Sequence, residues 1–276
     1  MPEKNNSVLF GFEVKSLLGI LSKIITHPLT LILSRKRALR YPFTASNGKT
    51  YSGTILGIAQ QLADEGFVNM ARGLTASCFK WIGKQVMNAA LKDTVKPFLK
   101  NVFIIEKDSS YFKRLLYKGL LGGTMGGLYL TVFYGLDRYI TVSALPPECV
   151  TEPSTIYDIY SGFGLSVLGM MLWRGLYVGI YDIVKPHKFT GFWGKFTSGF
   201  AVTTLTGLIL YPLGKIALTQ MVHCCTASKA ISIIHDHPDG LWEGYMGGCK
   251  ENIIRGLLGT MVLISFDYLK GWLKSE

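Results

Sequence analysis

A long apolar stretch of this sequence ends in Tyr181-Asp182-Ile183-Val184-Lys185, and the same pattern closes two other apolar stretches. One ends in Asp93-Thr94-Val95-Lys96 and the other in Phe266-Asp267-Tyr268-Leu269-Lys270. The three aspartates lie 89 and 85 residues apart, and a lysine follows each of them three residues later. A single Asp-x-x-Lys is a common solvated pair on any helix. Three copies in matching register indicate an internal repeat of about 90 residues.

The first half of each repeat shows a related correspondence. The matching segments are His27-Pro28-Leu29, Tyr134-Gly135-Leu136-Asp137 and Tyr211-Pro212-Leu213. Proline inside a helix removes a hydrogen bond and kinks it, so we expect bends where it stands. We divide the chain into repeats over residues 1–105, 106–190 and 191–276.

Composition favours a membrane location for these helices. The chain has 276 residues, 49% of them hydrophobic and only 17% charged, whereas a soluble domain carries about 25% charge. A helix needs about 20 apolar residues to cross a bilayer. Charged residues inside such stretches favour a water-filled interior, although a soluble α-domain with long core helices is the alternative. We predict an all-α membrane protein with six transmembrane helices in three pseudo-symmetric pairs around a cavity, with spans near 8–36, 75–99, 112–142, 157–185, 193–222 and 249–272.

The net charge and the chain's first residues constrain partners and targeting. The formal charge of +11 is spread over helix ends and connecting segments. This distribution favours anionic lipid and an anionic solute over nucleic acid. Residues Met1 to Ser7 lack the features of a secretory signal, so any targeting information is expected to be internal. The five cysteines contain no C-x-x-C, and we interpret them as reduced packing residues.

Three segments resemble the mitochondrial carrier family, and within it the ADP/ATP carriers. Gln85 to Asp93 reads QVMNAALKD and is similar to the carriers' Q-A-L-N-F-A-F-K-D. The segment from Tyr160 to Asp182 resembles their fourth helix, and Asn252-Ile253-Ile254-Arg255-Gly256 resembles N-V-L-R-G. The resemblance implies a six-helix barrel in the inner mitochondrial membrane, with cardiolipin as bound lipid and no other cofactor. The sequence shows no Ser/His/acid set, Walker loop or Rossmann fingerprint, so no enzymatic activity is expected.

The resemblance also implies a nucleotide site in the cavity. In ADP/ATP carriers, basic residues of the first, second and sixth helices contact phosphate groups, and the fourth helix receives adenine. Several cations around one cavity would attract a polyanion on physical grounds alone. The matching residues here are Lys23, Lys80, Asn88, Gly169, Met170, Trp173 and Arg255.

Family lipid sites lie where an aromatic-x-Gly turn meets the start of a helix, whose free amides suit phosphate. The resemblance implies three corresponding places in this chain. They are Arg72-Gly73, Tyr160-Ser161-Gly162 and Trp242-Glu243-Gly244.

Two sets of charged residues form the family's gates, and only one set is complete. The cytosolic gate is expected to consist of Asp93, Lys96, Asp182, Lys185, Asp267 and Lys270. The matrix gate needs P-x-[DE]-x-x-[KR] on each odd helix. Of that motif only Pro28, Asp137 and Pro212 remain. One acid of six gate charges survives, so no ring of ion pairs can form from the motif positions.

Loss of one gate affects alternating access, which needs two states of similar free energy. The protein is expected either to favour a form closed toward the cytosol, or to close the matrix side with an apolar plug of Leu33, Ile140 and Ala217. In both cases coupled exchange is expected to be impaired.

Two functions therefore compete. The first is a transport-impaired carrier that serves as an accessory subunit of a respiratory-chain or ATP-synthase assembly. The alternative is an active, divergent carrier of adenine nucleotides or related phosphorylated anions.

Two further motifs have simpler explanations than a ligand site. The glycine-rich run Gly122-Gly123-Thr124-Met125-Gly126-Gly127 could suggest a phosphate loop, but inside a span helix packing is the simpler account. His235-Asp236-His237 lacks further metal ligands, and Pro238 favours a turn.

Overall fold

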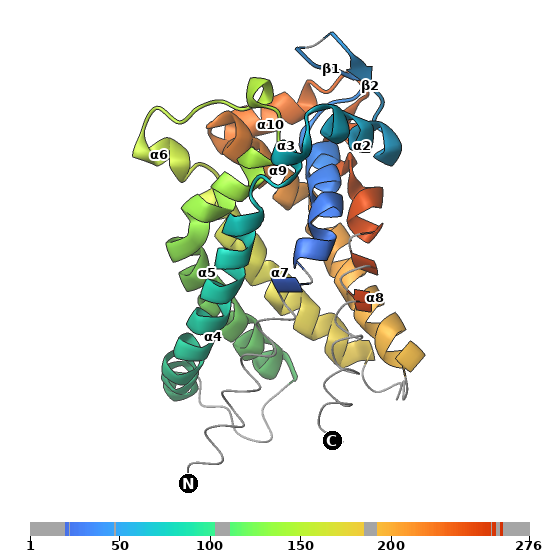
Figure 1. Cartoon of the computed structure of the whole chain (residues 1–276). Helices are drawn as coiled ribbons and strands as arrows, with labels where there is room; N and C mark the ends of the chain where they lie inside the picture. The colour runs from blue at the N-terminus through green and yellow to red at the C-terminus, as the bar shows by residue number, and fades with distance from the viewer. Residues whose placement is uncertain are drawn as a thin grey trace.

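The computed structural model describes residues 20–21, 23–46, 48–102, 111–184, 192–254, 256–257 and 260–261. These residues are mostly helical (Figure 1), which confirms the expected all-α class apart from a hairpin of two-residue strands. The long helices run side by side and splay apart toward the lower end of the view in Figure 1. The opposite end carries the short helices and the hairpin, and we call it the surface-helix end. The long elements are a first helix over residues 23–38, α4 (Leu74–Val102), α5 (Tyr111–Ser143), α7 (Phe163–Val184), α8 (Phe192–Ile209), α9 (Tyr211–His223) and a last helix that begins at residue 249.

Helices α5 and α7 pack closely through glycines. A Cβ placed on Gly119 would lie 3.2 Å from the Cα of Gly175, and one on Gly126 would lie 2.5 Å from the Cγ of Met170. A Cβ on Gly123 would lie 2.8 Å from the Cγ of Met171. The glycine-rich run of α5 therefore serves helix packing, as small residues do between membrane helices, and the phosphate-loop alternative is wrong.

The fifth predicted span is bent. Helices α8 and α9 meet at Leu210, two residues before Pro212, and their axes differ by 60° between Phe196–Ile209 and Tyr211–His223. Within the described residues, no single helix combines the length and apolarity of a membrane span, whereas this bent pair does. The bend lies where the proline predicts it, and the six-span arrangement stays a prediction.

The surface-helix end differs between the three repeats. Its elements in the first repeat are β1 (Phe43–Thr44), β2 (Thr50–Tyr51), α2 (Ile55–Asp64) and α3 (Phe67–Met70). The strands pair antiparallel. The third repeat has α10 (Ala227–His235) and α11 (Leu241–Met246).

The second repeat has the shortest elements at this end. Between α5 and α7 it has only a 3₁₀ turn (Pro147–Cys149) and the four-residue α6 (Ile156–Ile159). The long amphipathic helix found at the corresponding place in the first repeat, α2, has no counterpart here. Pro146, Pro147 and Pro153 lie in this segment, and proline disfavours helix continuation.

Candidate functional site

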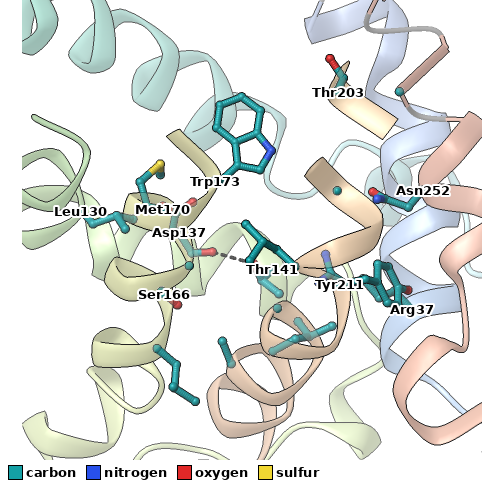
Figure 2. Close-up of a pocket in the computed structure, with 18 of the residues that line it drawn as sticks. Arg37, Leu130, Asp137, Thr141, Ser166, Met170, Trp173, Thr203, Tyr211 and Asn252 are labelled. Carbon is teal, nitrogen blue, oxygen red and sulfur yellow. Dashed lines mark hydrogen bonds between the residues drawn. The ribbon is translucent and has the colours of Figure 1, made fainter. Parts of the chain in front are cut away.

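A cavity of about 760 Å³ lies between the long helices (Figure 2). Its volume falls in the range of small-molecule sites. All the long elements contribute lining residues, from Arg37 on the first helix to Asn252 on the last. The lining is largely apolar or hydroxyl-bearing, and its charged members among the described residues are Arg37, Lys80 and Asp137.

The predicted nucleotide residues divide into three groups. Lys80, Gly169, Met170 and Trp173 line the cavity. Lys23 lies on the first helix with an exposed side chain, and it is not among the cavity-lining residues. The side chain of Asn88, on α4, and the whole of Arg255 lie outside the described residues, so their assignments stay predictions.

Two aromatic rings form a stacked pair on α7. The ring centroids of Trp173 and Tyr177 lie 5.1 Å apart with planes 24° from parallel, and both residues line the cavity. The guanidinium carbon of Arg174 lies 5.8 Å from the Trp173 ring. Flat aromatic faces of this kind stack with nucleobases. Tyr177 was missed at the sequence level, although its spacing of four from Trp173 puts both on one helix face.

Lys80 on α4 and Asp137 on α5 form an ion pair. Both side chains are partly buried, at 27% and 20% exposed. The pair connects a residue predicted to bind phosphate with the one acid that survives from the matrix-gate motif. Asp137 therefore contacts a cation on α4, the second predicted span. Among the described residues no ion pair connects it with the first helix, α8 or α9.

We call the first helix, α5 and the α8–α9 pair the odd helices, because they correspond to the first, third and fifth predicted spans. Cations that donate to backbone carbonyls join these helices at the surface-helix end. Each cation lies on one odd helix and reaches the C-terminal end of the next. We call this set the carbonyl clasp. Its three contacts are Arg35 to the Ala144 carbonyl, which directly follows α5, Arg138 on α5 to the Met221 carbonyl in the last turn of α9, and Lys215 on α9 to the Arg37 carbonyl in the last turn of the first helix.

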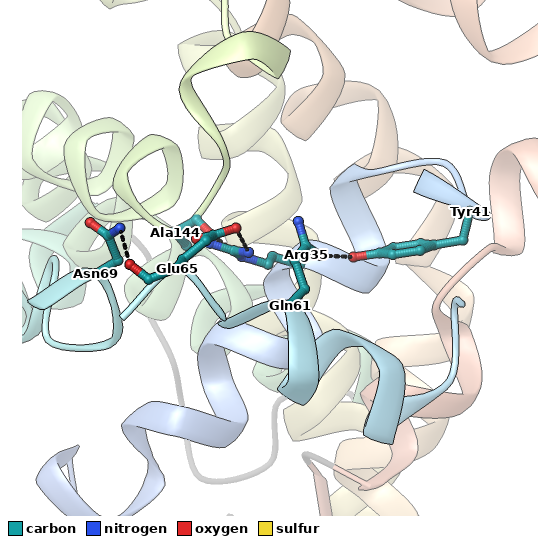
Figure 3. A network of polar contacts seen from close by, with 6 residues as sticks. All are labelled: Arg35, Tyr41, Gln61, Glu65, Asn69 and Ala144. Carbon is teal, nitrogen blue, oxygen red and sulfur yellow. Dashed lines mark hydrogen bonds and ion pairs between the residues drawn. The ribbon is translucent and has the colours of Figure 1, made fainter. Parts of the chain in front are cut away.

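Arg35 is the centre of a polar network at this end (Figure 3). Its Nε donates to the Ala144 carbonyl at 2.8 Å, and its two terminal nitrogens donate to the two carboxylate oxygens of Glu65. Asn69 donates from its Nδ2 to the Glu65 carbonyl at 2.8 Å. Arg35 is 3% exposed, so its charge is satisfied by a bidentate carboxylate contact, the strong form of this pairing.

Arg138 is 5% exposed and serves four acceptors. Its Nη1 donates to the carbonyls of Met221 and Asp158, and its Nη2 donates to the Thr151 carbonyl and the Cys224 Sγ. The side chain thereby holds the short connecting segment of the second repeat against α9. A cation next to the C-terminus of a helix is stabilised by the helix dipole.

The other residues of the predicted matrix gate are distributed as follows. Pro28 is exposed on the first helix, and Pro212 stands in the first turn of α9. Leu33 and Ala217 are buried, at 7% and 6% exposed, while Ile140 is half-buried. Apolar residues thus accompany the clasp, but the interhelical hydrogen bonds of the clasp were not foreseen.

The predicted cytosolic gate lies largely outside the described residues. Lys185, Asp267 and Lys270 are not described, and Asp93, Lys96 and Asp182 are described only as helical backbone. These six assignments stay predictions.

Two of the three predicted lipid turns have the expected form, and the third does not. Gly73 and Gly162 adopt φ values of +76° and +82° directly before α4 and α7. Trp242, Glu243 and Gly244 instead lie inside α11. The corresponding turn is Gly248, with φ +84°, directly before the last helix, so the placement at Gly244 is wrong by four residues.

The structure separates Arg72 and Tyr160 from the deep cavity. Both are exposed at the surface-helix end, and the Arg72 carbonyl contacts His27 Nε2 at 3.2 Å. Within the described residues no cluster of His, Cys, Asp and Glu could hold a metal. The five cysteines are free thiols in the structure.

Long helices around a cavity fit the class of solute carriers, and the known proteins similar to this chain are named as carriers. An ADP,ATP carrier protein of Neurospora crassa is 30% identical over 253 residues, covering 80% of this chain and 79% of the relative. One from Kluyveromyces lactis is 28% identical over 80% of each chain, and one from Chlamydomonas reinhardtii is 26% identical over 98% of this chain and 96% of the relative. No protein-family model matches the chain. The chain belongs to the mitochondrial carrier family, in the group of the ADP/ATP carriers.

Proposed function

We propose that this protein is an active, divergent carrier that exchanges adenine nucleotides across the inner mitochondrial membrane. The names of its relatives support the substrate class and the mitochondrial location. The cavity supports the same substrate, because a stacked pair of aromatic rings and a basic residue from another helix face one space. The expectation of an accessory subunit has no support from the relatives, which favour the alternative of an active carrier.

The carbonyl clasp is the observation that carries the proposal. Impaired exchange was expected because the matrix gate lacks its motif charges. The clasp supplies other contacts between the same three helices, one per repeat, in cyclic order. We infer that these charge–dipole contacts take the place of the missing motif charges in closing the gate.

The strength of such a clasp suits a reversible gate. A cation at a helix C-terminus stabilises by about 0.3–1 kcal/mol when exposed and by up to about 2 kcal/mol when partly buried. Three contacts would favour the closed end by about 1–6 kcal/mol. A bound ligand can reverse an equilibrium from 1:99 to 99:1 with about 5.5 kcal/mol of differential binding, so substrate binding can open this gate.

Exchange in reconstituted liposomes tests the proposal. Vesicles loaded with ADP should take up external labelled ADP or ATP with saturation, above the rate of protein-free vesicles. Uptake at the protein-free rate, with the protein folded and stabilised by lipid, would reject active exchange. Stable co-migration with a large respiratory assembly on native gels, without exchange, would revive the accessory role.

We also infer that cardiolipin binds at the turns before α4, α7 and the last helix. Gly73, Gly162 and Gly248 adopt positive φ values directly before these helices. Helix N-termini suit phosphate. Thermal stabilisation by cardiolipin that exceeds that by phosphatidylcholine would support these sites, and equal stabilisation by the two lipids would reject them.

A further inference from the structure

Arg37 differs from the other charged residues of the cavity. Lys80 and Asp137 neutralise each other as an ion pair. Among the described residues no carboxylate lies within ion-pair distance of the Arg37 guanidinium. The net positive charge of the described lining therefore comes from Arg37.

The environment of the Arg37 side chain is poor in hydrogen-bond acceptors. Its Nε is shielded from solvent and donates no hydrogen bond to the described residues. Its guanidinium carbon lies 5.0 Å from the centroid of the Tyr211 ring. Figure 2 labels both residues beside the cavity. A cation–π contact compensates only part of the cost of removing a cation from water. The five N–H donors of the guanidinium form a fork that suits phosphate.

Arg37 also contacts α9 at two neighbouring residues, Gly214 and Lys215. Its backbone carbonyl accepts a hydrogen bond from Lys215 as part of the clasp. Its Nη2 lies against Gly214, where a Cβ would approach it to 2.6 Å. Gly214 occupies the place of the acid in the family's P-x-[DE] motif. The missing side chain therefore leaves room for the guanidinium and removes its natural counter-ion.

We propose that Arg37 is an anion-binding residue of the cavity, whose ligand is the phosphate-bearing end of the transported solute. The inference rests on the proposed carrier function, and it names a residue that no motif assigns to the substrate. An incoming phosphate supplies the counter-ion that the protein itself omits at Gly214. Because the same residue bears the clasp carbonyl, phosphate binding acts directly beside the gate.

The test compares ligand binding by the full chain with that by Arg37→Gln, using thermal-shift titration in detergent with cardiolipin. ADP and pyrophosphate serve as probes that carry phosphate, and adenosine serves as a probe without it. We expect the apparent Kd for ADP and for pyrophosphate to rise about tenfold or more in Arg37→Gln, because a charge-assisted contact is lost. Adenosine binding should stay unchanged.

Lys36→Gln is the matched control. Lys36 is the neighbouring cation on the same helix, and its Nζ lies 5.7 Å from the Tyr41 ring outside the cavity lining. Lys36→Gln and Arg37→Gln change the net charge of the protein equally. An equal loss of affinity for ADP and pyrophosphate in both variants would therefore overturn the inference, because it would show a bulk charge effect. An unchanged Kd in Arg37→Gln would also overturn it. If Arg37→Gln does not fold, Arg37→Lys serves instead, with an expected loss of about threefold because the fork geometry is lost.

Exchange by the unmodified protein separates this inference from the proposed function. Saturable ADP exchange with an Arg37-independent Kd would reject the inference and leave the carrier function standing. Absence of nucleotide exchange with Arg37-dependent binding of pyrophosphate would reject the proposed function and support the anion site. Absence of binding by both phosphate probes would reject the inference.

Discussion

The Nη1 atom of Arg138 on α5 lies 2.7 Å from the carbonyl oxygen of Met221 in the last turn of α9. The same nitrogen lies 2.9 Å from the carbonyl oxygen of Asp158, in the short segment between α5 and α7. One buried side chain therefore joins two repeats at the point where the second repeat lacks a long connecting helix.

Replacement of Arg138 by methionine should destabilise the protein strongly. Methionine preserves much of the apolar volume but leaves three buried or partly buried carbonyls without their donor, which costs about 1–3 kcal/mol for each unsatisfied group. We expect Arg138→Met to lower the free energy of unfolding by about 3 kcal/mol. Thermal unfolding in detergent measures this, with the exposed Lys113→Met on the same helix as control. Equal melting temperatures for the two variants would contradict the clasp.

The ion pair of Lys80 and Asp137 should contribute a smaller coupling. Both side chains are partly exposed, so solvent screens their attraction. A double-mutant cycle with Lys80→Met, Asp137→Asn and the double variant should give a coupling energy of about 1 kcal/mol. Asp137→Asn alone should also bind ADP more tightly, since it raises the positive charge of the cavity. A coupling energy of zero would show that the two groups act independently.

Trp173 should matter for the base and not for the phosphates. Its ring stacks on Tyr177 and lines the cavity. Loss of a base-stacking ring costs about 1–3 kcal/mol, so Trp173→Ala should weaken ADP binding about tenfold or more while pyrophosphate binding changes little. Isothermal titration with both ligands checks this. Equal weakening of both ligands would place Trp173 in the scaffold rather than in the adenine site.

The sequence predicted the helical class, the bend before Pro212 and several cavity residues. The internal repeat made these predictions possible, because the same segment recurs in three copies and each copy supports the assignment of the other two. The clasp contacts could not be predicted from the gate motif, because the motif fixes both residue type and position. Arg138 and Lys215 each stand three residues after the Gly135 or Pro212 of their repeat, two positions before the motif's base, and their acceptors are backbone carbonyls that leave no trace in a sequence.

Arg37 and Gly248 illustrate two other limits of the sequence. Arg37 lies beyond the motif on the first helix, and its access to the cavity depends on how closely α9 approaches at Gly214. Gly248 is one of five glycines between residues 238 and 258, and a positive φ distinguishes it from Gly244 only in the folded chain. The access of Arg37 to the cavity and the turn conformation of Gly248 both depend on tertiary contacts, which the sequence does not show.

Asp64 should give a pH-dependent contribution at the surface-helix end. Hydrogen bonds from Lys49 and then from Tyr51 hold the pKa of the Asp64 carboxyl below its usual value. Its stabilising contribution is therefore fully present above the unfolded pKa of about 3.9 and is lost as the pH falls through the lower folded value. The difference in melting temperature between the wild type and Asp64→Asn should stay constant from about pH 8 to 5 and shrink only in stronger acid. A difference that shrinks already at neutral pH would contradict this linkage.

An acid at position 214 on α9, where the family motif has one, should stabilise the closed state of the gate. In Gly214→Asp the new carboxylate would stand next to the Arg37 guanidinium, whose Nη2 lies 2.6 Å from the position of a Cβ there, so the arginine must shift and pair with it. This pair would stabilise the closed end and compete with substrate phosphate for Arg37. We expect a higher melting temperature without ligand, ADP exchange about tenfold slower, and weaker binding of pyrophosphate, since each 1.4 kcal/mol corresponds to about a factor of ten. Gly214→Asn has nearly the same size without the charge and separates crowding from pairing. Exchange that is slowed equally in both variants would show that the side chain's volume, and not its charge, controls this site.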